Sequence, residues 1–419
     1  MKSSRQPGAA TRVLIVALNH APELTGIGKY VGEMTAYLVQ AGFAVKVIAA
    51  PPYYPAWSVQ VPYVAWRYER EERDGAIVWR CPLYVGNRPG GLWRIVHLLS
   101  FALSSLPLIL LQGLFWRPQV VMVIEPPLVC APAACLAAGL AGGQAWLHVQ
   151  DFEVDAAFDL GLLRSPRARA LASSLERWLM QRFDVVSSIS ARMVERLHSK
   201  GVAQARSRLF PNWVDTTAVQ PIARDNALRS ELGISGATRV ALYSGNMGEK
   251  QGLELLADVA RAFTPEEQVL FLFCGDGVSR SRLQHATADL KHVRFLPLQP
   301  LNRLNELLCL ADVHLLPQRA GAEDLVMPSK LTAILASGRP VVATATAGTE
   351  LARAAGAGGK VVPAGDAPAF VAALRELLAD SALCQQLGTG GRAFAQANFD
   401  REAVLGRLAH DLRHLSEKN

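Results

Sequence analysis

The sequence predicts an α/β protein built from two doubly wound domains, and three observations lead to this prediction. Two glycine-rich turns, at 25–29 and 244–252, each follow a short apolar run and precede a helical pattern. After each turn, apolar runs alternate with amphipathic stretches, which is typical of parallel sheets covered by helices on both faces. The chain has 419 residues, of which 50% are hydrophobic and 19% are charged, so it can form two globular cores.

The first half of the chain begins with the turn at 25–29. Its apolar runs are continuous rather than alternating, which indicates strands that are buried on both faces. Ser165 and Pro166 give the last of its helices the usual N-cap followed by proline. We expect strands at 13–18, 44–49, 76–81, 120–124, 145–149 and 185–189, and helices at 30–41, 92–114, 129–140 and 167–183.

The second half repeats the alternation after a junction that we place at 210–215. The expected strands are 240–243, 269–274, 293–297, 313–316, 340–344 and 360–362, and the expected helices are 253–263, 280–288, 301–310, 329–336, 368–379, 381–397 and 402–416. The predicted organisation is a loose tail at 1–11, an N-terminal doubly wound domain at 12–215 and a C-terminal doubly wound domain at 216–398. A final helix at 399–419 could pack back on the first domain.

Composition narrows the classes of partner. A net charge of +7 and a pI near 9.2 suit acidic small substrates, anionic lipid or nucleic acid. The sequence has no RNA- or DNA-binding motif and no Lys-rich block, which argues against nucleic acid. The six cysteines form no C-x-x-C pair, which suits reduced thiols in the cytosol, and the nine histidines lack metal-ligand spacing. We therefore predict no metal site.

Two segments leave alternatives open. Residues 95–116 contain no charged side chain, so they form a buried core helix, a helix that lies against a membrane, or a true span. Arg88, Arg94 and Arg117 beside them would suit an interfacial helix. Residues 51–66 combine prolines with five Tyr and Trp side chains. They form either an ordered loop packed on the domain, or an aromatic surface that stacks on sugar rings or lines an acceptor channel.

Several motifs give the chain a resemblance to a known family. They are Thr25-Gly-Ile-Gly28, Phe210-Pro-Asn-Trp-Val-Asp215, Gly245 with Gln251-Gly252, Cys274-Gly-Asp-Gly277, and Pro328-Ser-Lys330 with Gly338-Arg-Pro-Val341. Over nearly its whole length, the chain resembles the retaining glycosyltransferases of family 4, which have the GT-B fold. The runs at 21–30, 50–55, 78–84 and 244–253 are most similar to its colanic acid biosynthesis subgroup, which is thought to be of fucosyltransferase type.

The resemblance implies two Rossmann-like domains that face a central cleft, with the acceptor domain at 12–215 and the donor domain, which binds the nucleotide sugar, at 216–398. It implies transfer of a hexose, for this subgroup fucose from GDP-fucose, to a glycan or lipid-linked acceptor in exopolysaccharide biosynthesis. The reaction would retain the anomeric configuration of the sugar and would need no metal ion. It would also need no cofactor, since the GDP- or UDP-linked sugar is itself a substrate. The enzyme would be cytoplasmic and peripherally associated with the anionic cytoplasmic face of the inner membrane. The rival functions are a GT-B-like sugar-nucleotide epimerase and a membrane-bound scaffold whose catalysis has decayed.

The chain departs from the family pattern in its charged residues. Asn246 stands where family members have an arginine, and Gln251 where they have a lysine. The family's two glutamates, eight positions apart, would fall near Leu325 and at Ala333. The diphosphate must therefore be neutralised differently, and Lys250, Arg319 and Lys330 are the available cations.

The predicted donor site combines these cations with the glycine-rich turns. Such turns direct backbone N–H groups toward an anion, although Tyr30 replaces the Ser or Thr of an ATP-binding P-loop. Lys330 at a helix start could reach a phosphate as a point charge, or it could simply face solvent. Arg319 follows a strand end, where ligands gather in open α/β sheets. The predicted donor-binding residues are Gly26, Gly28, Gly245, Asn246, Lys250, Gln251, Gly252, Gly275, Gly277, Gln299 and Ser329.

The predicted catalytic residues are Asp151, Lys330 and Arg319. Asp151 follows the strand at 145–149 and could orient or partly deprotonate an acceptor hydroxyl, although it could equally cap a loop. The residues that we expect on the acceptor side are His148, Gln150, Ser190 and Asn212.

Overall fold

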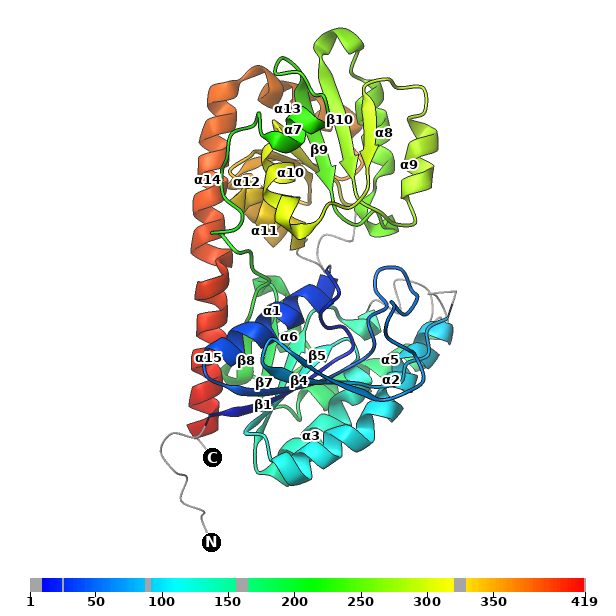
Figure 1. The fold of residues 1–419 in the computed structure, drawn as a ribbon, viewed down its shortest axis with the longest axis vertical. Helices are drawn as coiled ribbons and strands as arrows, with labels where there is room; N and C mark the ends of the chain where they lie inside the picture. Colours follow the sequence, from blue (N-terminus) through cyan, green and yellow to red (C-terminus); the bar gives the residue numbers. More distant parts are fainter. Residues whose placement is uncertain (1–9, 25, 87–91, 156–164, 320–328, 418–419) are drawn as a thin grey trace. The chain divides into compact units, whose positions relative to one another are not determined.

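The computed structural model describes residues 10–24, 26–86, 92–155, 165–319 and 329–417, without the side chains of residues 92, 250 and 329. Contacts divide the chain into two compact units (Figure 1). One contains Met1–Pro211 together with Leu405–Asn419, and the other contains Asn212–Val404. The second unit is therefore a single continuous segment, whereas the first unit combines the N-terminal half of the chain with its C-terminal end.

The first unit contains an eight-stranded sheet in the order β3-β4-β2-β1-β5-β6-β7-β8. Only the edge strand β3 is antiparallel. In the parallel part, Val13 lies opposite Val45 on one side and Val120 on the other. The strands are β1 (Arg12–Ala17), β2 (Ala44–Ala49), β3 (Glu69–Arg73), β4 (Ala76–Arg80), β5 (Val120–Glu125), β6 (Gln144–Val149), β7 (Val185–Ser188) and β8 (Ser207–Leu209).

Helices cover both faces of this sheet. The helices are α1 (Gly26–Gln40), α2 (Leu92–Leu111), α3 (Ala131–Ala141), α5 (Pro166–Met180) and α6 (Ala191–Ser199), with short turns η1 (Gln112–Trp116), η2 (Leu128–Cys130) and η3 (Gln204–Arg206). The connections from β4 through β8 all advance in one direction across the sheet, so right-handed crossovers place α2, α3, α5 and α6 on one face. The connection from β1 to β2 runs the other way and places α1 on the opposite face.

One hydrophobic cluster confirms this layering. Phe101 from α2, Ala134 from α3 and Met180 from α5 are buried together with Leu14 and Val123 of the sheet. The last helix, α15 (Arg401–Glu417), begins in the second unit and ends in the first. There, Arg413 donates a hydrogen bond to the carbonyl oxygen of Ala41, and its guanidinium lies 4.9 Å from the Phe43 ring.

The second unit contains a six-stranded, fully parallel sheet in the order β11-β10-β9-β12-β13-β14. Its strands are β9 (Arg239–Ser244), β10 (Val269–Cys274), β11 (Val293–Leu296), β12 (Val313–Leu316), β13 (Val341–Thr344) and β14 (Gly359–Val362). Its helices are α7 (Ala227–Glu231), α8 (Glu254–Arg261), α9 (Arg280–Ala286), α10 (Leu304–Cys309), α11 (Ser329–Ala336), α12 (Glu350–Gly356), α13 (Ala367–Ala379) and α14 (Ser381–Phe399), with turns η4 (Glu249–Gln251), η5 (Pro265–Glu267) and η6 (Leu301–Arg303). The strand order changes direction beside β9, so β9 and β12 flank the point where ligands bind in such sheets.

The structure confirms the predicted strands within two residues, and it adds elements that the sequence pattern did not indicate. The added elements are β3, β8, α6, α7 and α12. The sequence of β3 is Glu-Arg-Glu-Glu-Arg, and its side chains are half-buried or exposed because it forms the edge of the sheet. An edge strand does not need the apolar run by which a central strand is recognised.

The charge-free segment is not a buried core helix. It folds as α2 followed by the π-helical turn η1, and the stretch Trp93–Trp116 is the one described helix long and apolar enough to cross a membrane. Only 22% of its apolar stretch is buried, although Phe101 and Ile109 on its inner side are fully buried. The aromatic segment at 51–66 divides similarly, because Tyr53 packs against Trp57 and His97 whereas Trp66 is exposed.

Candidate functional site

The turn between β9 and α8 has the strand–turn–helix form that the sequence predicts. Gly245 follows β9 with φ 122°, and Gly252 ends η4 in the left-handed region with φ 59°. Four of the turn's amides are used inside the protein. Gly245 N–H donates to the carbonyl oxygen of Cys274 and Met247 N–H to that of Asp276, while the amides of Gln251 and Gly252 donate within the turn itself. Among the described residues, the amides of Asn246, Gly248 and Glu249 donate to no backbone carbonyl, so they are available to an anion.

Gly275 and Gly277 have a packing reason for being glycine. A Cβ at Gly275 would lie 2.0 Å from the Gly245 carbonyl oxygen, and a Cβ at Gly277 would lie 2.6 Å from the Met247 carbonyl oxygen. Both have positive φ values, 147° and 146°. The two turns thus press against each other through their backbones, which accounts for these glycines without a nucleotide. Their predicted contact with base or ribose stays a prediction.

Lys330 lies in the first turn of α11, beside the end of β9. Its Nζ donates a 2.7 Å hydrogen bond to the Tyr243 hydroxyl and lies 4.2 Å from the centre of that ring. The Tyr243 hydroxyl in turn donates to the carbonyl oxygen of Asn246 at 2.6 Å. A Cβ at Gly245 would lie 3.6 Å from Nζ, so the missing side chain leaves room beside the ammonium group. Burial lowers the pKa of Lys330 to about 7.

Arg319 follows β12 and reaches the same edge of the sheet. Its guanidinium forms an ion pair with Glu254 at the start of α8, with Nε 2.9 Å from the carboxylate. A Cβ at Gly252 would lie 3.2 Å from the Arg319 amide nitrogen, so Gly252 allows the two segments to approach. The structure therefore brings Gly245, Asn246, Gly252, Arg319 and Lys330 together at the carboxyl ends of β9 and β12. The Arg319 side chain is 45% exposed and its partner 54%, so this ion pair can open at little cost.

Four other predicted donor residues have weaker support. Gln251 is half-buried, and its Oε1 has no hydrogen-bond partner among the described residues. Gln299 follows β11 and donates to the carbonyl oxygen of Pro297 at 3.0 Å. The side chains of Lys250 and Ser329 lie outside the described part of the structure, as do Thr25, Pro328 and the positions expected for the first family glutamate.

The first glycine-rich segment is helical rather than a free turn. The helix α1 already begins at Gly26, which has φ 63°, and Gly28 lies in its first turn. A Cβ at Gly28 would lie 2.4 Å from a carboxylate oxygen of Glu23, so Gly28 makes room for that side chain. Glu23 accepts hydrogen bonds from the amides of Tyr53 and Tyr54. A carboxyl group of the protein thus occupies the space at the start of this helix. The turn that the sequence predicts at 25–29 is corrected, because the helix already begins at Gly26.

Asp151 lies immediately after β6 and is partly exposed. In the strand itself, His148 is buried, and its Nδ1 lies 2.9 Å from the Ser187 hydroxyl. Its Nε2 lies 3.0 Å from the side-chain amide nitrogen (Nε2) of Gln150. Burial lowers the pKa of His148 to about 3. His148 and Gln150 therefore hold the strand end in place, with the imidazole neutral, while Asp151 is positioned beyond them.

The other two predicted acceptor-side residues have local roles. Ser190 is the N-cap of α6, where its hydroxyl accepts from the Met193 amide at 3.1 Å. Asn212 is buried at the start of the second unit. Neither observation tests a contact with an acceptor.

Sequence reasoning missed two buried carboxyl groups near Asp151. Glu125 ends β5, and its Oε1 accepts from the Glu153 amide at 3.4 Å. Glu153 in turn accepts from the Leu128 amide at 2.6 Å, so the pair joins the loops that follow β5 and β6. Burial raises the pKa of Glu153 to about 7 and raises the pKa of Glu125 well above its usual range, where the Glu153 charge adds to the effect. The sequence signal that could have revealed Glu125 is its position as the single charged residue at the end of the apolar strand β5.

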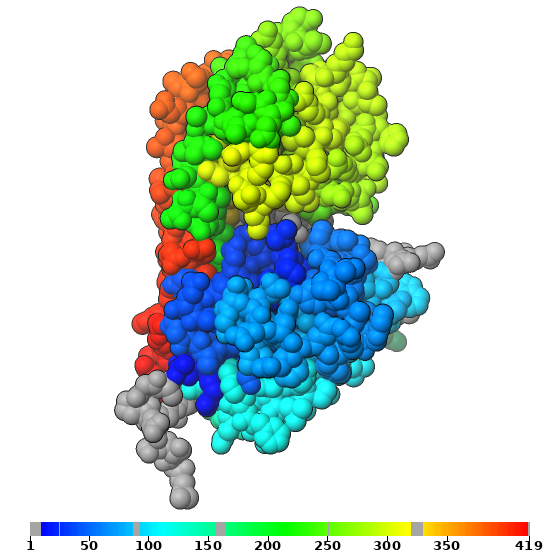
Figure 2. Space-filling model, viewed as in Figure 1, coloured from blue at the N-terminus to red at the C-terminus, as the bar shows by residue number. Residues whose placement is uncertain are grey.

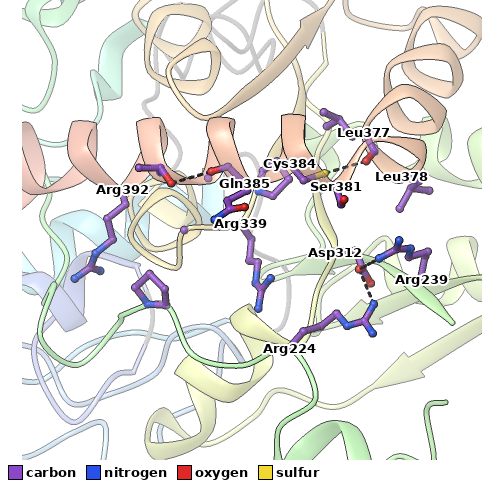
Figure 3. Close-up of a pocket in the computed structure, with 15 residues that line it drawn as sticks. Arg224, Arg239, Asp312, Arg339, Leu377, Leu378, Ser381, Cys384, Gln385 and Arg392 are labelled. Carbon is purple, nitrogen blue, oxygen red and sulfur yellow. Dashed lines mark hydrogen bonds and ion pairs between the residues drawn. The ribbon is translucent and has the colours of Figure 1, made fainter. Parts of the chain in front are cut away.

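A cavity of about 680 Å³ lies at the opposite end of the second unit's sheet, where β9, β12 and β13 begin (Figure 3). Arg224 and Arg239 both reach Asp312 at 3.0 Å, and Arg392 donates to three backbone carbonyls. None of the predicted site residues lines this cavity. Elsewhere, no group of three His, Cys, Asp or Glu side chains within the described ranges could hold a metal ion.

Comparisons with known proteins match most of the chain. Residues 25–213 match the family model described as a glycosyl transferase 4-like domain, and residues 238–380 match glycosyl transferases group 1. WcaI of Escherichia coli (strain K12), which is named as a colanic acid biosynthesis glycosyl transferase, is 41% identical over 413 residues. These cover 96% of this chain and 100% of WcaI.

Two solved structures share the fold. Sucrose-phosphate synthase from Thermosynechococcus elongatus superposes with a TM-score of 0.75 at 17% identity, over 98% of this chain and 100% of the synthase. HepE of Anabaena, solved in complex with UDP and glucose, superposes with a TM-score of 0.69 at 14% identity, over 96% of this chain and 100% of HepE.

Proposed function

The chain belongs to the GT-B glycosyltransferases of family 4, and on this premise we propose that it transfers a sugar from a nucleoside diphosphate donor in exopolysaccharide biosynthesis. The product would be a colanic-acid-like glycan, and GDP-fucose is the first donor to test. The observation that carries the proposal is the cluster of Lys330, Arg319 and the β9–α8 turn at one edge of the second unit's sheet. The end-to-end similarity to WcaI supports the glycan class.

The proposed donor chemistry depends on charge. A departing nucleoside diphosphate carries about two negative charges, and cations together with backbone amides stabilise them in the transition state. Lys330 supplies a point charge and the amides of Asn246 and Gly248 supply neutral donors. Arg319 would exchange its surface ion pair with Glu254 for the diphosphate. In this proposal the reaction retains configuration and needs neither a metal ion nor a cofactor.

The proposed acceptor chemistry involves Asp151. It follows β6 of the first unit, where His148 and Gln150 fix the strand end by hydrogen bonds. A carboxylate in this position can accept a hydrogen bond from an acceptor hydroxyl and make its oxygen more nucleophilic. We assign the acceptor to a lipid-linked oligosaccharide at the cytoplasmic face of the inner membrane, with which the enzyme associates peripherally.

A thermal-shift panel of GDP- and UDP-linked sugars tests the donor first, with the Lys330→Ala variant as control. The sugar that raises the melting temperature of the parent but not of the variant is then incubated with a lipid-linked oligosaccharide. NMR of the product reports transfer and anomeric configuration, and a parallel reaction in EDTA tests metal independence. Without transfer, release of an epimerised nucleotide sugar would favour the epimerase alternative. If the protein neither binds a donor nor turns one over, the decayed-scaffold alternative would be favoured. That alternative is motivated by the missing family arginine and glutamates.

A further inference from the structure

Large apolar side chains are exposed on the helices α2, α3 and α5 of the first unit and on the short turns η1 and η2 beside them. We call this surface the apolar platform. Each of its side chains is between 38% and 75% exposed, and they are Trp93, Ile95, Leu99, Leu103, Leu106, Leu111, Leu114, Phe115, Val129, Leu136, Leu140, Leu171, Leu175 and Trp178. Large contiguous apolar patches are rare on soluble monomers, and they mark interaction sites.

The exposed residues form stripes at helical spacing. On α2, Ile95, Leu99 and Leu103 recur every fourth residue on the outer side, while Phe101 on the inner side is fully buried in the core. On α3, Leu136 and Leu140 repeat the pattern. Both sides of α2 are therefore apolar, and among the described residues of the unit only the inner side packs into the core.

The stripes face outward together because their helices share one layer. The crossovers that connect β4 through β7 place α2, α3 and α5 on the same face of the sheet, and their inner residues meet in one core cluster. The helices α2 and α3 pack side by side, and α3 also packs on η1. In the view of Figure 2, atoms of the 100–140 region, in cyan, lie uncovered at the margin of the first unit.

The charges around the platform are mainly positive, although the exposed Asp184 near Cys135 of α3 is acidic. The helices α2 and α3 contain no acidic residue, and the single one in α5, Glu176, is buried in an ion pair with Lys200. Arg167 in the first turn of α5 and Arg182 just after its last turn lie at either end of the stripe, and the Arg182 guanidinium lies 4.8 Å from the Trp178 ring. The other exposed arginines nearby are Arg117, Arg169 and Arg177.

We propose that the apolar platform seats the first unit on an anionic bilayer, with α2, α3 and α5 lying in the plane of the interface. Apolar side chains enter the acyl boundary while the arginines meet lipid phosphates, as amphipathic interfacial helices do. A second copy of the chain fits the surface less well, because a symmetric contact would bring the arginines of both copies together. A span is excluded by the core contacts of Phe101 and Ile109, which crossing would break.

This inference deepens the proposed function, on which it rests for the lipid-linked acceptor. The platform would keep the enzyme where such acceptors are made. Binding to vesicles needs neither donor nor acceptor, however, so the two proposals can fail separately.

The test is co-flotation of the full-length protein with vesicles of phosphatidylcholine alone or with about a third phosphatidylglycerol. We expect binding that requires the anionic lipid and that is released by alkaline carbonate. Replacing Leu103, Phe115 and Leu171 by Gln should weaken binding by about a thousandfold, because each buried apolar side chain contributes about tenfold. Replacing Arg167 and Arg182 by Gln should weaken it by about fivefold for each charge on anionic vesicles.

The matched control is Val278→Gln with Leu301→Gln in the second unit, where the side chains are 75% and 50% exposed. These variants should bind like the parent, and thermal melts should show that all variants fold. The proposed membrane role of the apolar platform is refuted if the parent does not bind anionic vesicles, or if the triple Gln variant binds them as tightly as the parent. Resistance of the parent to carbonate would overturn the in-plane orientation. A dimer that the Gln substitutions dissociate, with vesicle binding unchanged, would assign the surface to a second copy.

Discussion

Lys330 gives the sharpest prediction, which concerns the pH dependence of donor binding. Burial beside Tyr243 lowers the pKa of this ammonium group to about 7, because the charged form loses its hydration. A diphosphate near Nζ would restore the charged form and raise the pKa again. At pH 8 about nine tenths of the free protein would hold a neutral Lys330, so donor binding should take up about 0.9 proton. At pH 6 the uptake should fall to about 0.1 proton.

The affinity should follow the same linkage. Above the pKa of about 7, each pH unit makes the protonated protein about ten times rarer, so the donor affinity should fall nearly tenfold between pH 8 and pH 9. A nucleotide sugar is the proper ligand, because both of its phosphates are esterified and keep a constant charge over this range. Burial raises the pKa of the neighbouring Tyr243 hydroxyl, which therefore stays protonated.

Calorimetry in buffers of different ionisation enthalpy measures the proton uptake directly. The Lys330→Arg variant should bind with little pH dependence, since its guanidinium stays charged. The Lys330→Met variant should lose about ten- to a hundredfold in affinity at pH 6, the worth of one charge-assisted contact, and little at pH 9. Lys46→Met is the matched control, because burial also lowers the pKa of Lys46 but that residue lies in the first unit. Equal proton uptake by the parent at pH 6 and pH 8 would refute the reasoning.

The same pKa shift has a consequence for folding. In the unfolded chain a lysine keeps its proton up to about pH 10.4. Unfolding therefore takes up a proton between about pH 7 and pH 10, and the contribution of Lys330 to stability should rise with pH in that window.

Three further predictions concern single substitutions. Asp151→Asn should leave donor affinity unchanged by calorimetry and slow transfer roughly 10²–10⁴-fold, and normal turnover would remove Asp151 from the catalytic role. Arg319→Gln should weaken donor binding, whereas Glu254→Gln, which removes the partner of the same arginine, should not. Equal effects of the two variants in a binding assay would mean that Arg319 forms only a surface ion pair and does not bind the donor. Gly275→Ala should cost at least about 2 kcal/mol in a denaturant titration, because its Cβ would lie 2.0 Å from the Gly245 carbonyl oxygen at a left-handed φ; an unchanged midpoint would contradict this.

The sequence predicts those features that depend on neighbouring residues. Buried parallel strands such as β10 show themselves as apolar runs, and the start of α11 at Ser329 follows from its local pattern. The charged strand β3 could not be found in this way, because its pairing with β4 in a hairpin holds it in place rather than an apolar face.

Features that depend on distant residues stayed hidden. The residues near Lys330 in the sequence do not predict its hydrogen bond to Tyr243, which lies 87 positions away. The glycine at 28 suggested a phosphate turn, whereas the folded chain uses it to accommodate Glu23. Glu125 and Glu153 became neighbours only because β5 and β6 pair in the sheet. Whether the predicted donor and acceptor residues bind their ligands stays a prediction.

The return of the chain to its first unit bears on the order in which the protein is made. Leu405, Leu408 and Leu412 of α15 are fully or almost fully buried, and Arg413 donates a hydrogen bond to Ala41, which directly follows α1. A ribosome releases these residues only after the whole second unit has emerged. The part of the protein that is synthesised first is therefore completed last, and until then its uncovered apolar face is open to chaperones and to aggregation. A fragment that stops at Pro211 would remain in that state permanently.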